Sequence, residues 1–160
     1  MKEKSKIRKP QLIGRKDKAD FPLLDLFNID VKIDTGAYSS SIHCHNIEII
    51  NTDSDDAGKV RFNLLDPSHP DYNEKEFVLP VSRVKNVKSS SGVAESRIFI
   101  KTKILLFNSM YNIELNLTDR SNMKYPVLLG RKLLKNRFMV DVTREFLSHN
   151  DKLQQGMDKK

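Results

Sequence analysis

The sequence contains a single cysteine, Cys44, and no apolar run long enough to cross a bilayer. One cysteine cannot form a disulfide within the chain, and a membrane-spanning helix needs about 20 consecutive apolar residues. The N-terminus is charged and is not followed by the apolar segment of a signal peptide. These absences predict a protein of a reducing, cytoplasmic compartment with no membrane partner.

Nucleotide-binding and metal-binding motifs are also missing. The chain has no GxxxxGK[ST] phosphate loop, no GxGxxG fingerprint and no HExxH zinc motif. The candidate that remains for a metal is His43-Cys44-His45, but on a strand the two histidines share one face and the cysteine points to the other. We therefore expect no metal and no cofactor, with solvent-facing histidines and a buried Cys44.

The net charge of +7 is concentrated at the N-terminus. Residues 1–18 contain eight lysines and arginines against two acidic residues, whereas the other 142 residues contain 20 against 19. A body so nearly balanced in charge argues against a nucleic-acid groove. We expect residues 1–12 to form a disordered basic arm. An arm that binds RNA or an acidic protein is the alternative, and deleting residues 1–12 would separate the two.

The pattern of apolar residues predicts strands. A length of 160 residues suits one domain. Apolar positions alternate at 60–64, 98–106 and 111–117, and the last two stretches are joined by a short Asn-Ser connection that suits a hairpin. A short helix is predicted at 130–136, with Leu133 and Leu134 facing inward. The sequence thus predicts an all-β domain over residues 13–149, a barrel or sandwich with one short helix near its end, and a disordered tail over residues 150–160.

The stretch VKIDTGAYSSSIH, residues 31–43, ends a predicted strand with residues that strands disfavour. Asp34 could hold and deprotonate a water molecule, and the hydroxyl of Thr35 could lock the loop. Gly36 would let other backbone segments approach closely. A β-turn that opens with Asp34 is the plain alternative, because so short a motif also arises by chance.

About ninety residues later, an apolar strand runs into Gly130-Arg131 and the predicted helix. We call Asp34-Thr35-Gly36 the DTG loop. The order of strand, DTG loop, long β region, aliphatic pair, glycine and helix resembles that of the retroviral-type aspartic peptidases, the retropepsins. Their two signature stretches correspond here to residues 33–37 and 128–134. The resemblance implies a closed β-barrel, with catalytic roles for Asp34, Thr35 and Gly36 and structural roles for Gly130 and Arg131.

Five motifs in order narrow the resemblance to a bacterial subfamily of retropepsin-like proteins. They are IGRKD, KIDTGAYSSSIH, VKSSSGVAESR, LTDRSNMKYPVLLGRKLL and FMVDV, and they span roughly residues 13–141. The subfamily is known under the label "ATP-dependent zinc protease", and it is often encoded near a RimK-type ATP-grasp ligase that adds glutamate to a ribosomal protein. The resemblance implies a peptide or protein substrate, with glutamate-modified chains as one candidate.

In that family a β-hairpin flap covers the active site. Residues 86–97, NVKSSSGVAESR, lie between two alternating strands and have a small tip suited to a lid; an ordinary exposed hairpin loop is the alternative. The resemblance implies substrate contacts from Ala37, Ser89, Ser90, Ser91, Gly92, Arg97, Asp119 and Arg120. For Glu95, Arg97, Asp119 and Arg120, a structural role in charge pairs stays open beside recognition of a charged peptide.

The chain carries one DTG motif, although aspartic peptidases use two carboxylates that share a proton. The resemblance therefore implies a twofold homodimer with Asp34 of each chain at the axis. Retropepsins usually carry an aspartate at the position of Tyr38, where it pairs with the arginine that corresponds to Arg131. We expect Arg131 to use another partner, such as Asp119 or Asp141. Because of this departure, a non-catalytic binding or dimerisation module on the same fold is the alternative.

Overall fold

The structure is a computed structural model, and it describes residues 9–50, 58–88, 92, 94–119 and 124–158. These residues form eleven strands, a short 3-10 helix and two α-helices. In chain order they are β1 (Gln11–Ile13), β2 (Lys16–Phe21), η1 (Pro22–Leu24), β3 (Leu26–Ile33), β4 (Ser40–Ile50), β5 (Lys59–Leu64), β6 (Glu76–Pro80), β7 (Arg83–Lys88), β8 (Ala94–Leu106), β9 (Ser109–Thr118), β10 (Val127–Leu129), α1 (Arg131–Leu134), β11 (Phe138–Val140) and α2 (Leu147–Asp158).

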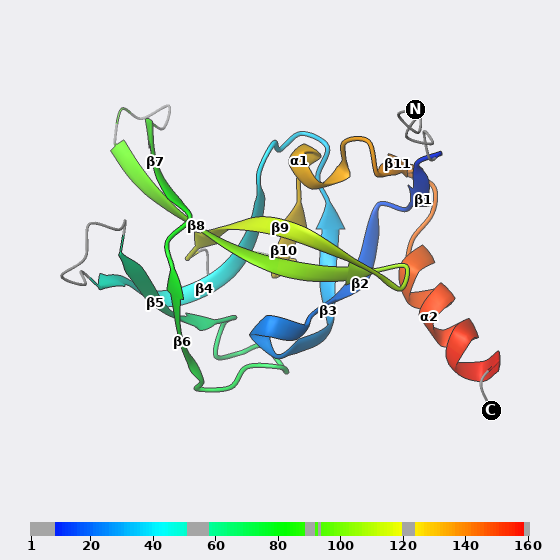
Figure 1. Ribbon diagram of the computed structural model, residues 1–160, viewed down its shortest axis with the longest axis horizontal. Coiled ribbons are helices and arrows are strands. Elements are labelled where there is room, and N and C mark those ends of the chain that lie inside the picture. The colour runs from blue at the N-terminus through cyan, green and yellow to red at the C-terminus, as the bar shows by residue number, and fades with distance from the viewer. Residues whose placement is uncertain (1–8, 51–57, 89–91, 93, 120–123, 159–160) are drawn as a thin grey trace, which may run out of the picture.

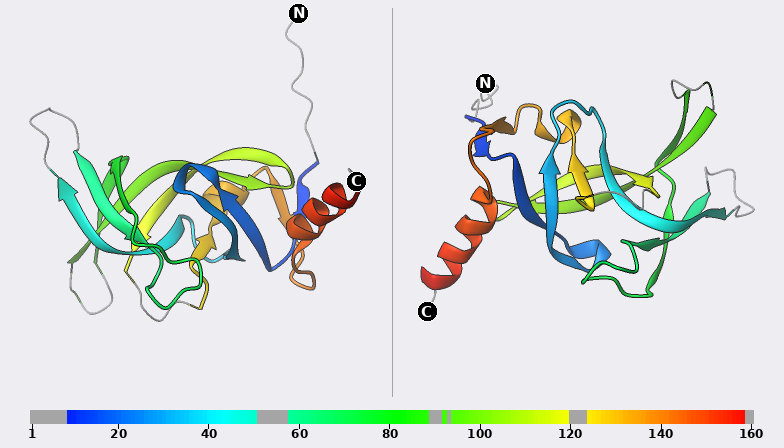
Figure 2. Two further views of the ribbon diagram at one scale, coloured as in Figure 1. Left: turned by 90° about the horizontal axis from the view of Figure 1, so that it is seen from below. Right: turned by 180° about the vertical axis from the view of Figure 1, so that it is seen from behind.

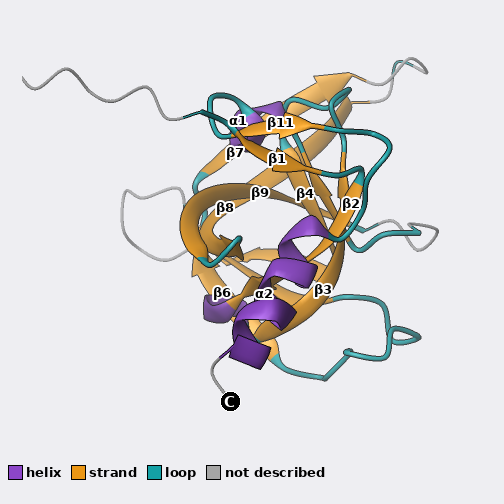
Figure 3. Cartoon of the chain, turned by 90° about the vertical axis from the view of Figure 1, so that its right-hand side faces the viewer, coloured by secondary structure: helices purple, strands orange, loops and turns teal. Residues whose placement is uncertain are grey.

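Six of the strands close into a mixed barrel. Their order is β10-β3-β2-β8-β9-β4, and β10 also pairs with β4, which completes the circuit. The β10–β3 and β4–β9 pairs are parallel and the others are antiparallel. The strands curve around a common centre, and α2 lies outside them (Figure 3). The predicted closed β-barrel is confirmed.

Two extensions project from the barrel. Strand β7 pairs with the first half of β8, and β5 and β6 continue the sheet beyond β4. The hairpin of β7 and β8 rises at one end of the molecule, whereas β1, β11 and α2 lie at the other (Figures 1 and 2). The barrel thus separates the predicted flap from helix α2.

The core follows the alternation seen in the sequence. Val60 and Phe62 of β5, Ile100 and Ile104 of β8, and Leu115 of β9 are fully buried. Burial of such a side chain contributes roughly 1.5–3 kcal/mol, so these strands are stabilised mainly by their inward faces. The predicted hairpin between β8 and β9 is confirmed, with a two-residue turn at 107–108 whose residues both have positive φ.

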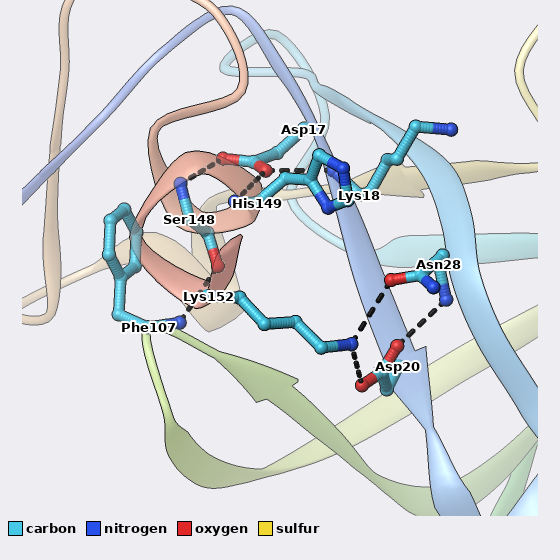
Figure 4. Close-up of polar contacts among 8 residues, drawn as sticks. All are labelled: Asp17, Lys18, Asp20, Asn28, Phe107, Ser148, His149 and Lys152. Carbon is cyan, nitrogen blue, oxygen red and sulfur yellow. Dashed lines mark hydrogen bonds and ion pairs between the residues drawn. The ribbon is translucent and has the colours of Figure 1, made fainter. Parts of the chain in front are cut away.

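The C-terminal segment corrects the prediction of a disordered tail. Residues 147–158 form helix α2, and no helix of the described segments is both long and apolar enough for a membrane span. Polar contacts hold α2 against β2, which is why apolar periodicity gave no signal for it (Figure 4). The buried carboxylate of Asp17 accepts hydrogen bonds from the backbone N–H of Ser148 at 2.9 Å and of His149 at 3.0 Å. Lys152 Nζ lies 2.8 Å from Asp20 Oδ2.

The folded domain also begins earlier in the chain than the predicted residue 13. The expected arm of residues 1–12 overlaps the described structure, because Gln11 and Leu12 belong to β1, which pairs in parallel with β11. Residues 1–8 of that arm lie outside the described residues. Backbone pairing with a strand more than a hundred residues away forms β1, so local charge and hydropathy could not indicate it.

Candidate active site

The DTG loop begins where β3 ends and is anchored by a strand from the far end of the chain. Strand β10 lies between β3 and β4, parallel to the first and antiparallel to the second. The backbone N–H of Asp34 donates to the carbonyl of Leu129 at 2.8 Å. One short strand therefore fixes both flanks of the loop.

The loop presents the carboxylate of Asp34 at the surface. Asp34 is half-buried, and its Oδ1 accepts a hydrogen bond from the backbone N–H of Gly36 at 3.1 Å. A Cβ at Gly36 would lie 3.3 Å from the same Oδ1, so a larger residue here would require the Asp34 carboxylate to shift by a few tenths of an ångström. Thr35 and Gly36 are exposed. The carboxylate is thus oriented by backbone while solvent still reaches the loop.

Helix α1 packs its first turn against this loop. The N–H of Arg131 donates to the carbonyl of Ala37 at 2.8 Å, and the N–H of Lys132 donates to that of Tyr38 at 2.9 Å. A Cβ at Gly130 would lie 2.6 Å from the carbonyl oxygen of Ser39, closer than real contacts allow. Glycine at position 130 therefore permits the helix and the loop to touch.

Arg131 finds other partners than those expected. Its Nη1 donates to the carbonyl oxygen of Thr35 at 3.0 Å, and its guanidinium carbon lies 6.0 Å from the centre of the Tyr38 ring. Asp141 instead accepts hydrogen bonds from Thr143, which lower the pKa of its carboxyl group. Tyr38 thus replaces a carboxylate with an aromatic face, and Arg131 still braces the DTG loop.

A polar cleft of about 320 Å³ opens beside Asp34. Its walls are formed by Asp34, Ala37, Tyr38, Ser39, Ser41, Lys85, Arg97, Asn116, Thr118 and Leu128. Of the predicted site residues, Asp34, Ala37 and Arg97 meet here. Thr35, Gly92 and Asp119 are exposed but do not line the cleft, and Ser89, Ser90, Ser91 and Arg120 lie outside the described residues.

Strand register explains which side chains reach the cleft. Lys85 of β7 pairs with Arg97 of β8, and Ser41 of β4 pairs with both Asn116 of β9 and Leu128 of β10. Paired residues on neighbouring strands point to the same face of the sheet. Sequence reasoning missed Lys85, although its position opposite Arg97 across the flap hairpin was a signal that could have found it.

Comparison with known proteins identifies the family. A family described as "Retropepsin-like aspartic endopeptidase RimB" matches residues 12–151. The chain belongs to this RimB-like family. The predicted resemblance to retropepsin-like aspartic peptidases is confirmed.

Curated relatives of this RimB-like chain are longer proteins. A "probable alpha-L-glutamate ligase" of Shewanella pealeana is 35% identical over 139 residues, which cover 84% of this chain and 29% of that protein. One of Parasynechococcus marenigrum is 33% identical over 134 residues, which cover 81% of this chain and 28% of that protein. The chain therefore spans less than a third of the length of these relatives.

A solved structure shares the fold. The Legionella pneumophila protein Lpg0085, of unknown function, matches with a TM-score of 0.64 and 25% identity. The match covers 88% of the RimB-like chain and 99% of the Legionella chain. The fold of the chain is thus shared with this Legionella pneumophila protein.

An apolar groove of about 430 Å³ also borders the DTG loop in this RimB-like chain. It is lined by Thr35, Tyr38, Arg131, Leu134, Lys135, Phe138 and Val140. Tyr38 is 55% exposed, so its ring is open to a partner at this groove. The loop that carries Asp34 therefore borders a polar cleft and an apolar groove.

In the His43-Cys44-His45 segment, His43 and Cys44 lie in the fold's interior and His45 is half-buried. Cys44 is buried, as expected, and burial raises the pKa of its thiol. His43 is also buried, 3.8 Å from Asp66, so the expectation of a solvent-facing side chain was wrong for it. His45 lies 2.8 Å from the carbonyl oxygen of Leu65. Within the described ranges, no three His, Cys, Asp or Glu side chains are arranged to hold a metal ion.

Proposed function

We propose that the protein is a homodimeric aspartic endopeptidase whose active site is formed by Asp34 of two chains. The observation that carries the proposal is the position of Asp34, whose carboxylate is oriented by the Gly36 N–H at the edge of a polar cleft. Membership of an aspartic endopeptidase family supports this role. Since each chain has one such aspartate, the second carboxylate must come from a second copy.

In the proposed mechanism, two Asp34 carboxylates share one proton, because adjacent like charges resist ionisation of both groups. The ionised carboxylate takes a proton from water as the water oxygen attacks the scissile carbonyl carbon. The protonated carboxyl group gives its proton to the carbonyl oxygen, which yields a tetrahedral gem-diol. A proton passes to the amide nitrogen, the C–N bond breaks, and an acid and an amine leave.

The apolar groove beside Thr35 is the proposed dimer surface. It joins the DTG loop to α1 and β11, so a second chain seated there would bring its own Asp34 loop close to the first. The exposed ring of Tyr38 gives such an interface a large apolar contact. Arg131 stiffens this edge through its hydrogen bond to Thr35.

The charge of the cleft favours an acidic peptide as substrate. Lys85 and Arg97 face each other across the flap strands and both line the cleft beside Asp34. Ammonium and guanidinium groups bind carboxylates through charge-assisted hydrogen bonds. The curated relatives are named glutamate ligases and include a region similar to this chain. We propose cytoplasmic, glutamate-modified proteins as the substrate class.

The test is hydrolysis of a fluorogenic glutamate-rich peptide, compared with a neutral peptide of equal length, over a range of pH. We expect wild type to cleave the acidic peptide and Asp34→Asn to lose measurable activity while its thermal unfolding midpoint is retained. Asp25→Asn is the matched control, because Asp25 is exposed and has a φ of 55°, which asparagine tolerates. Hydrolysis by Asp34→Asn at the wild-type rate would refute the proposal.

A non-catalytic module is the second candidate, favoured by Tyr38 at the position of the usual aspartate. It predicts that the protein dimerises and binds the peptide, that wild type shows no cleavage, and that Asp34→Asn changes neither property.

A further inference from the structure

A row of cations leads away from the cleft along one face of strand β8. Alternate residues of a strand point to the same side, and the register between β8 and β9 runs without a shift, so positions 97, 99, 101 and 103 share a face. Arg97 lines the cleft beside Asp34, and Lys101 and Lys103 line a second groove of about 510 Å³. The row therefore begins at the candidate active site and continues beyond it.

Arg83 supplies a cation at the position that Phe99 occupies in this row. Phe99 lies between Arg97 and Lys101, and it pairs with Arg83 of β7. The guanidinium carbon of Arg83 lies 3.9 Å from the centre of the Phe99 ring, and Phe99 is 2% exposed. We call the resulting row of four cations the basic track: Arg97, Arg83, Lys101 and Lys103.

The charges of the basic track are open to a ligand. Lys101 and Lys103 are exposed and Arg97 is half-buried, and none of these three side chains forms an ion pair with a residue that the structure describes. Arg83 donates to Glu114 at 2.9 Å, but the side chain of Glu114 is only 9% exposed. The acidic group is thus covered while the cations face solvent.

The spacing of the basic track matches that of an extended acidic chain. Side chains on one face of a strand recur every roughly 6.5 Å, and the track from Arg97 to Lys103 is about 20 Å long. Every second side chain of an extended peptide repeats at the same interval. A run of glutamates along the track would therefore meet a cation at each step. Glu95 precedes the track on the same face and Leu105 follows it, so the track is bounded at both ends.

A peptide suits the basic track better than a nucleic acid does. Proteins that bind single-stranded nucleic acids stack the bases on open aromatic rings. The ring of Phe99 is covered by Arg83 and offers no such platform. Carboxylates need only the charge-assisted hydrogen bonds that arginine and lysine donate.

We propose that the basic track is a second substrate-binding surface, which holds an acidic stretch of the peptide outside the cleft. This role rests on the proposed peptidase function. It narrows the substrate class to chains that carry about six consecutive residues rich in glutamate or aspartate, next to those bound beside Asp34.

The test measures binding of two peptides to Asp34→Asn protein, which is expected to leave them uncut. Both share one acidic core, extended at both ends by about eight glutamates or by as many glutamines. We expect Lys101→Gln combined with Lys103→Gln to lower affinity for the glutamate-extended peptide by about three- to tenfold at low salt. Affinity for the glutamine-extended peptide should not change. Lys101→Arg combined with Lys103→Arg should retain the wild-type affinities, because arginine keeps the charge.

Lys9→Gln combined with Lys59→Gln is the matched control, since both lysines are exposed and lie off the basic track. The control removes the same charge and should leave both affinities unchanged. Equal weakening in the control would overturn the proposed role, because net charge alone would then explain the binding. Tighter binding of a single-stranded oligonucleotide of equal charge would also overturn it.

Cleavage by wild type separates this role from the proposed function. If wild type cleaves the acidic core but the glutamate extension does not tighten binding, the peptidase stands and the role of the basic track is overturned. If the extension tightens binding through Lys101 and Lys103 but wild type cleaves neither peptide, the proposed function is refuted and the basic track is supported as a surface for acidic peptides.

Discussion

At the residue scale, Gly130 lies where helix α1 contacts the segment after the DTG loop, and an added Cβ would clash there. A Cβ there would lie 2.6 Å from Ser39 O and 2.7 Å from Tyr38 O, both backbone atoms. Gly130→Ala must therefore push the helix from the loop, and we expect it to lower the free energy of unfolding by about 1–3 kcal/mol. Activity should fall with it, because Arg131 braces Thr35 from the same helix.

Gly156→Ala is the matched control for this substitution. Gly156 lies in α2, and a Cβ added there would have no neighbouring atom within 4 Å, so alanine should stabilise the helix by up to about 1 kcal/mol. Chemical denaturation of both variants gives the comparison. Equal changes in the free energy of unfolding of the two variants would show that the close approach at Gly130 does not affect stability.

At the scale of elements, helix α2 depends on one buried carboxylate. Asp17 accepts hydrogen bonds from two N–H groups at the start of α2, which otherwise have no acceptor within the helix. Asp17→Ala should cost about 0.5–2 kcal/mol and speed hydrogen exchange at Ser148 and His149. Asp151→Ala, on an exposed position of the same helix, should change neither. Peptidase activity should persist in both, because α2 and the flap lie at opposite ends of the molecule (Figure 1).

The start of strand β7 and helix α1 are joined by Glu114 of β9. Its carboxylate accepts hydrogen bonds from Ser82 Oγ at 2.6 Å, from Arg83 Nε of β7 at 2.9 Å, and from Lys132 Nζ of α1 at 3.2 Å. Burial by itself would raise the pKa of Glu114, but these donors hold it below its ordinary value of 4.5. This group therefore stabilises the fold above pH 4.5, and its contribution is lost as pH falls through the lowered pKa.

Glu114→Gln should remove that acid-dependent part of the stability and cost about 1–3 kcal/mol at neutral pH. Urea denaturation at several pH values between about 3 and 7 measures it. Glu74→Gln, at an exposed position, is the control. Parallel loss of stability in wild type and Glu114→Gln as pH falls would contradict the role assigned to Glu114.

Local signals in the sequence predicted the elements that depend on near neighbours. The alternation of Ile113, Leu115 and Leu117 was enough to place a strand, and Phe107-Asn108 adopts the predicted turn. The family motifs brought Asp34 and Arg97 together. Asn116 and helix α2 were missed because each depends on distant segments: register across three strands for Asn116, and the carboxylate of Asp17 for α2.

At the scale of the whole molecule, the DTG loop borders two different surfaces. The polar cleft contains Asp34 with Lys85 and Arg97, and the apolar groove contains Tyr38, Leu134 and Phe138. Under the proposed function, the polar cleft binds an acidic peptide and the apolar groove binds a second copy of the chain. The family fold accounts for the barrel, and the account of function requires that two such chains act together.

Mixing wild-type subunits with Asp34→Asn subunits tests that requirement most directly. The two proteins are unfolded together, refolded in varied ratios at constant total concentration, and assayed on the glutamate-rich peptide. If both aspartates of a dimer are needed, activity follows the square of the wild-type fraction, so an equal mixture keeps about a quarter of the wild-type rate. A linear decline, with about half of the rate at equal mixing, would show that each chain works alone and would contradict the account.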